Sequence, residues 1–151
     1  MSLHRELEFR PVADPDDPDD WRPGSELAVV FDAAANMAVL GERLAPGDTI
    51  PLHRHRTDEA VVYLAGTVEV RLGGEKYEAQ PGDVLLIPAG TPHSMRNTGD
   101  VVAEFRATFP SARVDIEYLE RNPMPGTEGD QPQPPFAVDL HTGAVSPLDA
   151  G

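Results

Sequence analysis

Two histidines and a glutamate lie close together in the stretch PLHRHRTDEAVVYLAG, residues 51–66. If the segment around His53 and His55 is a strand, their imidazoles share one face, because side chains alternate across a strand. Glu59 follows a short polar turn and opens an apolar segment, so it can return on a neighbouring strand to meet the histidines. His93 follows the tight turn PAGTP at the start of another such segment. These three imidazoles and one carboxylate predict a site for one divalent transition metal.

The ordinary interpretation of a histidine in a strand is a surface residue or a satisfied core residue. The chain has five histidines, and three of them fall in this one constellation, which favours the metal site. Four protein ligands would leave the remaining octahedral positions open for water, dioxygen or a chelating substrate. Nitrogen and oxygen ligands do not separate Fe, Mn, Ni and Zn, so the identity of the ion stays open.

Short segments of strand character alternate with turn signals between residues 27 and 109. Apolar and β-branched residues fill these segments, and glycine, proline and aspartate mark the turns. The clearest turn, Leu72-Gly73-Gly74-Glu75, predicts a two-residue hairpin. Many short strands without long helical periodicity predict an all-β antiparallel sandwich or barrel. The expected strands are LAVVF (27–31), MAVLGERL (37–44), EAVVYLAG (59–66), TVEVRL (67–72), EKYEAQ (75–80), DVLLIP (83–88), HSMRN (93–97) and VVAEFRATF (101–109).

Strand parity selects the side chains expected to line a pocket around the metal. Every second residue after Glu59 and after His93 faces the interior, as does the apolar face of VVAEFRATF. A mostly hydrophobic pocket of this kind suits a small, partly apolar or aromatic ligand. Tyr63 is a weak candidate for a catalytic acid or base, and an ordinary core position is the simpler interpretation for it. The expected pocket-lining residues are Val61, Tyr63, Met95, Asn97 and Phe105.

The chain has 151 residues, the size of one domain with tails. We expect an irregular N-terminal arm at 1–26, whose run DPDDPDD predicts a solvated acidic loop, and a barrel at 27–109. The segment 110–151 is expected to be a C-terminal extension, rich in proline at RNPMPGTEGDQPQPPF, that packs on the barrel or on a partner subunit. Within it, ARVDIEYLE fits a strand or a short helix, and we favour the strand.

The composition limits the partners and the compartment. With 26 acidic and 12 basic residues the formal charge is −14, which argues against nucleic acid and anionic membranes as partners. The chain has no cysteine, so thiolate metal sites and disulfides are excluded. The segment MSLHRELEFR has no apolar signal-peptide core, and no segment approaches the roughly 20 apolar residues of a membrane helix. We therefore expect a soluble cytoplasmic protein with a small-molecule ligand.

Two groups of residues resemble the two sequence motifs of the cupin family. Each group keeps the order and spacing of the family's motif without a departure, and fifteen residues separate the groups. That short spacing is typical of small single-domain bacterial members. The resemblance covers 47–97 at the level of motifs and 27–109 as a barrel. The first motif is matched by Gly47, His53, His55, Glu59 and Gly66, and the second by Gly82, Pro88, Gly90, His93 and Asn97.

The cupin resemblance implies a fold and a ligand set. The fold is an antiparallel double-stranded β-helix, also called a jelly-roll barrel. The glycines and the proline of the motifs are expected to serve the turns rather than the chemistry. The ligands that the resemblance implies for one metal ion per chain are the four residues already selected above, His53, His55, Glu59 and His93.

The resemblance leaves the reaction open, because cupins include dioxygenases, sugar isomerases and epimerases, polyketide cyclases, storage proteins and sensory domains. Our leading hypothesis is a metal-dependent oxidoreductase of the dioxygenase type. The alternatives are an isomerase or cyclase that uses the ion as a Lewis acid, and a non-catalytic binding module. Single-domain cupins are commonly dimers, so we also expect a homodimer.

Overall fold

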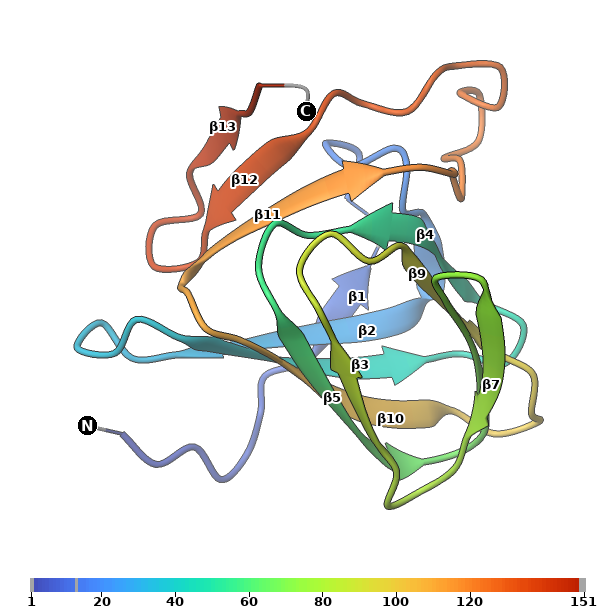
Figure 1. The fold of residues 1–151 in the computed structure, drawn as a ribbon, viewed down its shortest axis with the longest axis horizontal. Coiled ribbons are helices and arrows are strands. Elements are labelled where there is room, and N and C mark those ends of the chain that lie inside the picture. The colour runs from blue at the N-terminus through green and yellow to red at the C-terminus, as the bar shows by residue number, and fades with distance from the viewer. Residues whose placement is uncertain (1, 13, 150–151) are drawn as a thin grey trace.

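A computed structural model describes residues 2–12 and 14–149, and the regular structure in this part of the chain is entirely β-strand. It includes no helix long and apolar enough to cross a membrane. The strands form two antiparallel sheets, one in the order β1-β2-β3-β10-β5-β8 and one in the order β13-β12-β11-β4-β9-β6-β7. The sheets are drawn in Figure 1. The strands are β1 (Arg10–Val12), β2 (Arg22–Phe31), β3 (Ala38–Leu44), β4 (Thr49–Arg54), β5 (Glu59–Ala65), β6 (Val68–Leu72), β7 (Glu75–Ala79), β8 (Val84–Ile87), β9 (His93–Asn97), β10 (Ala103–Phe109), β11 (Arg113–Tyr118), β12 (Phe136–Asp139) and β13 (Val145–Pro147).

The sequence signals for individual strands and turns are confirmed. β6 and β7 form the expected hairpin, with Leu72 paired with Glu75 and with Gly73 in the left-handed region at φ 59°. The ambiguous segment ARVDIEYLE contains strand β11 and no helix. The whole arrangement is the antiparallel jelly-roll barrel that the motifs implied.

The core lies between the two sheets and follows the predicted parity. In β10 the side chains alternate between buried and half-buried, and the buried set includes Phe105 and Phe109. β5 contributes Val61 and Tyr63, which are almost completely buried. Burying each large apolar side chain contributes about 1.5–3 kcal/mol. This core fixes β3, β5 and β10, the strands that face the candidate site.

The terminal segments are more regular than the sequence suggested. The expected N-terminal arm, 1–26, contains β1 and the first residues of β2. The expected extension, 110–151, contains β11, β12 and β13, which lie side by side at one end of the barrel (Figure 1). β11 pairs with β4 and so extends the second sheet. Pairing satisfies backbone groups that a barrel edge would otherwise leave open, which explains the order in these segments.

The acidic run at residues 14–20 is not the solvated loop that its composition suggests. Asp19 is fully buried and forms an ion pair with the buried side chain of Arg121. Its other oxygen accepts a hydrogen bond from the backbone N–H of Gln133 at 2.8 Å. Asp17 accepts a hydrogen bond from the hydroxyl of Tyr118, also at 2.8 Å. The run therefore joins the N-terminal segment to the C-terminal extension.

Gly66, which follows β5, is the tightest of the motif glycines. Its φ is +78°, and a Cβ at this position would lie 2.8 Å from the Cα of Ala103. The left-handed conformation and the close backbone approach both act against a side chain. We therefore expect Gly66→Ala to lower the free energy of unfolding by about 2–4 kcal/mol in urea denaturation.

Gly74 provides the matched control for this substitution. It lies outside the left-handed region, and a Cβ there would meet no atom within 4 Å. Gly74→Ala is expected to change the free energy of unfolding by no more than about 0.5 kcal/mol. If the two substitutions had equal effects, the left-handed conformation and the close backbone approach would not be the reason for a glycine at position 66.

Candidate metal centre

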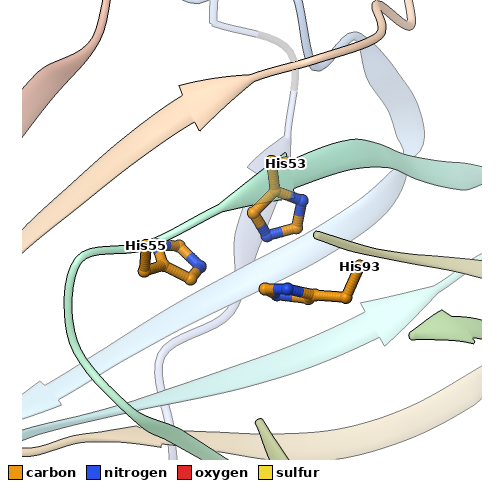
Figure 2. Close-up of side chains that lie close together, drawn as sticks. All are labelled: His53, His55 and His93. Carbon is orange, nitrogen blue, oxygen red and sulfur yellow. The ribbon is translucent and has the colours of Figure 1, made fainter. Parts of the chain in front are cut away.

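Three histidines from two paired strands form one buried group, called here the histidine cluster: His53, His55 and His93. His53 lies in β4, His55 directly follows that strand, and His93 opens β9. The register of β4 and β9 places His53 opposite His93. One ring nitrogen of each lies within 4.8 Å of the others, and Figure 2 shows the three rings side by side inside the barrel. The structure thus brings together the three predicted imidazoles.

Backbone carbonyls orient all three imidazoles. The Nδ1 atom of His53 is 2.7 Å from the carbonyl of Pro51, and that of His93 is 2.9 Å from the carbonyl of Thr91. The Nδ1 atom of His55 is 2.5 Å from the carbonyl of Asp115 in β11. Since a carbonyl only accepts, each Nδ1 carries the proton and each Nε2 presents its lone pair. Three Nε2 lone pairs are the donor set that a transition metal binds.

Glu59 lies beside the cluster at the first position of β5. Its Oε1 atom is 3.3 Å from the Nε2 of His55 and 3.2 Å from the Nε2 of His93. The side chain is buried. The fourth predicted ligand therefore reaches the two imidazoles from the facing sheet, as its position after the polar turn suggested.

The chemistry of these atoms fits a cation. Glu59 Oε1 and His93 Nε2 are buried and have no hydrogen-bond partner among the described residues. With the ring protons on Nδ1, the facing atoms are all acceptors, so their lone pairs oppose one another without a proton or a metal between them. Buried polar atoms without a partner cost about 1–3 kcal/mol each. A divalent metal bound by the cluster and Glu59 would remove that cost.

The electrostatics of His53 and Glu59 favour the protonation states that a metal requires, whereas the contact of His55 with Glu59 favours its protonated form. Burial, and then the neighbouring imidazoles, lower the pKa of His53 well below its usual value. Burial opposes protonation of His55, but its contact with Glu59 outweighs burial and raises its pKa. Burial also opposes ionisation of Glu59, yet the contacts with the two histidines lower its pKa to about 2. At neutral pH the site therefore contains an ionised Glu59 beside a neutral His53.

A cavity of about 380 Å³ opens beside the histidine cluster. The cluster and Glu59 line one part of it, and the rest is mainly apolar. Two of the expected lining residues, Met95 and Phe105, are in its wall. β11 and β12 contribute further apolar side chains, among them Ile116 and Phe136. The C-terminal extension therefore packs on the barrel and helps to form the cavity. The sequence alone did not decide between packing on the barrel and packing on a partner subunit.

The other expected lining residues are buried but are not among the residues that line this cavity. The hydroxyl of Tyr63 lies 3.6 Å from the sulfur of Met95. Burial raises the pKa of Tyr63 further above its usual value, which is unsuited to acid–base work at neutral pH. Asn97 donates to the carbonyls of Leu44 and Val101 at 2.8 Å. Asn97 thus ties a turn together, and Val61 belongs to the core.

The cavity wall also includes polar residues that lie outside the two sequence motifs. Glu42 in β3 and Arg22 in β2 are both in its wall and both buried. Strand parity contained a signal for Glu42, because it occupies the same face of MAVLGERL as Leu40 and Leu44. Arg22 had no such signal, since it lies in a segment that the sequence assigned to an irregular arm.

Sequence comparison places the chain in a family. Residues 42–109 match the family model described as a cupin domain. Protein SchB of Streptomyces halstedii is 36% identical over 122 residues, which cover 76% of this chain and 88% of that protein. The chain therefore belongs to the cupin family.

The chain is also similar in sequence to part of a known enzyme and in fold to a solved structure. Quercetin 2,3-dioxygenase of Bacillus subtilis is 51% identical over 51 residues, 33% of this chain, and the chain spans 15% of that protein's length. A solved structure of a sugar phosphate isomerase of the cupin superfamily, from Silicibacter pomeroyi, has a TM-score of 0.65 at 22% identity. That similarity covers 95% of this chain and 93% of the other. It confirms the cupin fold along nearly the whole chain.

Proposed function

We propose that this cupin is a metal-dependent oxidoreductase of the dioxygenase type that acts on a small hydroxylated aromatic molecule. The observation that carries the proposal is the position of the histidine cluster and Glu59 in the wall of a mainly apolar cavity. A mainly apolar cavity favours a ligand with an apolar part, and a metal ion in its wall would favour one that also has oxygen donors. The similarity to quercetin 2,3-dioxygenase supports the same choice.

In this proposal His53, His55, His93 and Glu59 hold one divalent metal ion. An ion held by these residues would supply Lewis-acid activation of an oxygen donor of the substrate and, as Fe²⁺, the redox chemistry that dioxygen requires. The three backbone carbonyls hold the imidazoles in position before the ion arrives, so little reorganisation accompanies binding. Apolar side chains such as Phe105 and Ile116 pack on the aromatic ring and exclude water from it.

Oxygen uptake tests the proposal. Protein that contains Fe²⁺ is expected to consume oxygen when supplied with a panel of catechols, flavonols and diketones, as measured with an oxygen electrode. The same protein with His53→Ala and His55→Ala is expected to show only background uptake. Turnover that continues without oxygen would point instead to an isomerase or cyclase in which the metal acts as a Lewis acid. A metal-loaded protein that consumes no oxygen with any compound of the panel would rule out the oxidoreductase.

We also propose that the protein is a homodimer that pairs along β8. This strand is the last of its sheet, and Val84 and Leu86 on its outer face are 61% and 70% exposed. An open strand edge with apolar side chains is a preferred site for pairing with a second copy. Light scattering at micromolar concentration is expected to give twice the mass of one chain. Leu86→Lys is expected to shift that mass toward the monomer, and a monomeric parent protein would contradict the proposal.

A further inference from the structure

Glu42 is an acidic residue on an otherwise apolar face of β3. Its inward neighbours along the strand are Leu40 and Leu44, and its partners across the sheet are Leu27 of β2 and Phe105 of β10. The side chain is 9% exposed and lines the same cavity as the histidine cluster. A carboxyl group in such a place is costly unless it is compensated. Its position therefore calls for a structural or a chemical reason.

A structural reason would be that Glu42 neutralises the buried charge of Arg22. The contacts of Arg22 show that Asp20 already serves this purpose. Arg22 makes two short bonds to the carboxylate of Asp20, from Nε at 2.7 Å and from Nη2 at 2.9 Å. Its contact with Glu42, from Nη1 to Oε2, is longer at 3.4 Å. The contact with Arg22 uses Oε2 and does not involve Oε1. Asp20 already compensates the guanidinium, so Glu42 keeps an oxygen free to interact with a ligand in the cavity.

The surroundings of Glu42 set its proton affinity. Arg22 faces it from β2 and stabilises its ionised form, while Asp20, Glu59 and the burial itself favour the protonated form. The inward side chains of β10 carry no charge. The remaining titratable groups around the cavity are the histidine cluster, Asp14, Asp17 and Tyr118. Burial is the largest effect and raises the pKa of Glu42 to about 7. An acid–base residue is most effective when its pKa lies near the working pH.

We propose that Glu42 is the acid–base residue of the cavity and that its carboxylate accepts the proton of a phenolic or enolic hydroxyl of the bound substrate. The O–H bond of the substrate breaks, an O–H bond forms on Glu42, and the substrate is left as its phenolate or enolate. No electron is transferred in this step. The inference rests on the proposed function for the class of substrate, but it holds for the dioxygenase and for the Lewis-acid alternative, since both begin with an ionised oxygen donor.

Proton counting tests this role. Catechol is titrated by calorimetry into zinc-loaded full-length protein at about pH 8, above the pKa of Glu42, in two buffers of different ionisation enthalpy. In the parent protein Glu42 captures a proton that catechol loses. In Glu42→Gln that proton goes to the buffer, so we expect about one more proton released per catechol bound. Glu42→Asp keeps a carboxylate that can accept the proton, so it is expected to release as many protons per catechol bound as the parent protein.

Glu104→Gln is the matched control, because Glu104 lies in the neighbouring strand β10 on the half-buried outer face and carries the same charge. It is expected to release as many protons as the parent protein. In turnover, the acid limb of the pH profile of kcat/KM is expected to be present in the parent protein and lost in Glu42→Gln, with a decrease of about 10²-fold or more in kcat/KM.

The outcomes separate this inference from the proposed function. The role of Glu42 would be overturned if the parent protein and Glu42→Gln bound catechol and released equal numbers of protons. It would also be overturned if the pH profile of the parent protein had no acid limb near the pKa of Glu42. Either result would leave Glu42 as a structural partner of Arg22. Absence of catechol binding by the parent protein and by all three variants would overturn the proposed substrate class, and the role of Glu42 with it. If Glu42→Gln fails to fold, the comparison of Glu42→Asp with the parent profile still decides, because the shorter acid is expected to keep the limb and shift its midpoint.

Discussion

Replacing both His53 and His55 by alanine is expected to reduce the metal content from about one ion per chain to almost none. Two of the four proposed ligands disappear, and Glu59 and His93 alone do not form a closed site. Elemental analysis of protein purified without added metal measures the loss directly. In the parent protein, an added divalent ion at about 100 times its Kd is expected to stabilise the fold by about 2.7 kcal/mol. The double variant is expected to lose this stabilisation.

His4→Ala is the control for this experiment, because His4 is exposed and lies in the N-terminal segment. It removes an imidazole from the chain but leaves the histidine cluster intact, so its metal content and its stabilisation by metal are expected to match the parent protein. A parent protein that takes up no ion under any loading condition would overturn the metal centre. The identity of a bound ion would also separate the oxygen chemistry from the Lewis-acid chemistry.

Asp19→Ala is expected to lower the free energy of unfolding by about 3–5 kcal/mol. The substitution leaves the guanidinium of Arg121 buried without its carboxylate, and it also removes the acceptor of the Gln133 N–H. An uncompensated buried charge is far more costly than a lost surface contact. Chemical denaturation followed by circular dichroism measures the change.

Asp16→Ala is the matched control for Asp19→Ala. Asp16 belongs to the same acidic run and carries the same charge, but its side chain is exposed. It is expected to change the free energy of unfolding by no more than about 0.5 kcal/mol. A small effect at both positions would contradict the structural role of Asp19, whereas a large effect at both would indicate that the net charge of the run, and not the ion pair, is what matters.

The barrel and the histidine cluster were predictable because their signals are local. The period of two in segments such as VVAEFRATF fixes which side chains are buried, and the HxH spacing places two imidazoles together once a strand is assumed. The second motif then supplies His93 directly after the tight turn PAGTP. Each of these inferences needs only a few neighbouring residues and the geometry of a strand.

The parts that were not predictable depend on partners far away in the chain. Asp19 looks like any solvated aspartate until Arg121 and Gln133 are placed beside it. Parity correctly turned Val61 and Tyr63 inward, but it does not say which part of the interior is cavity and which is packed core. Glu42 carried a parity signal, yet only the structure shows that Asp20 takes the two short bonds to Arg22 and leaves Glu42 with one longer contact, through Oε2.

The contacts that join the N-terminal segment to the C-terminal extension are expected to form late in folding. The contacts Tyr118 to Asp17 and Gln133 to Asp19 join residues 101 and 114 positions apart, whereas the β6–β7 hairpin closes over two residues. Contacts between distant residues form late, because the entropy of closing a long loop must be overcome first. During synthesis the barrel strands and the histidine cluster emerge before residues 113–139, which complete the cavity wall. Because the carbonyl of Asp115 in β11 orients His55, the metal site and its substrate cavity are completed together, once β11 pairs with β4.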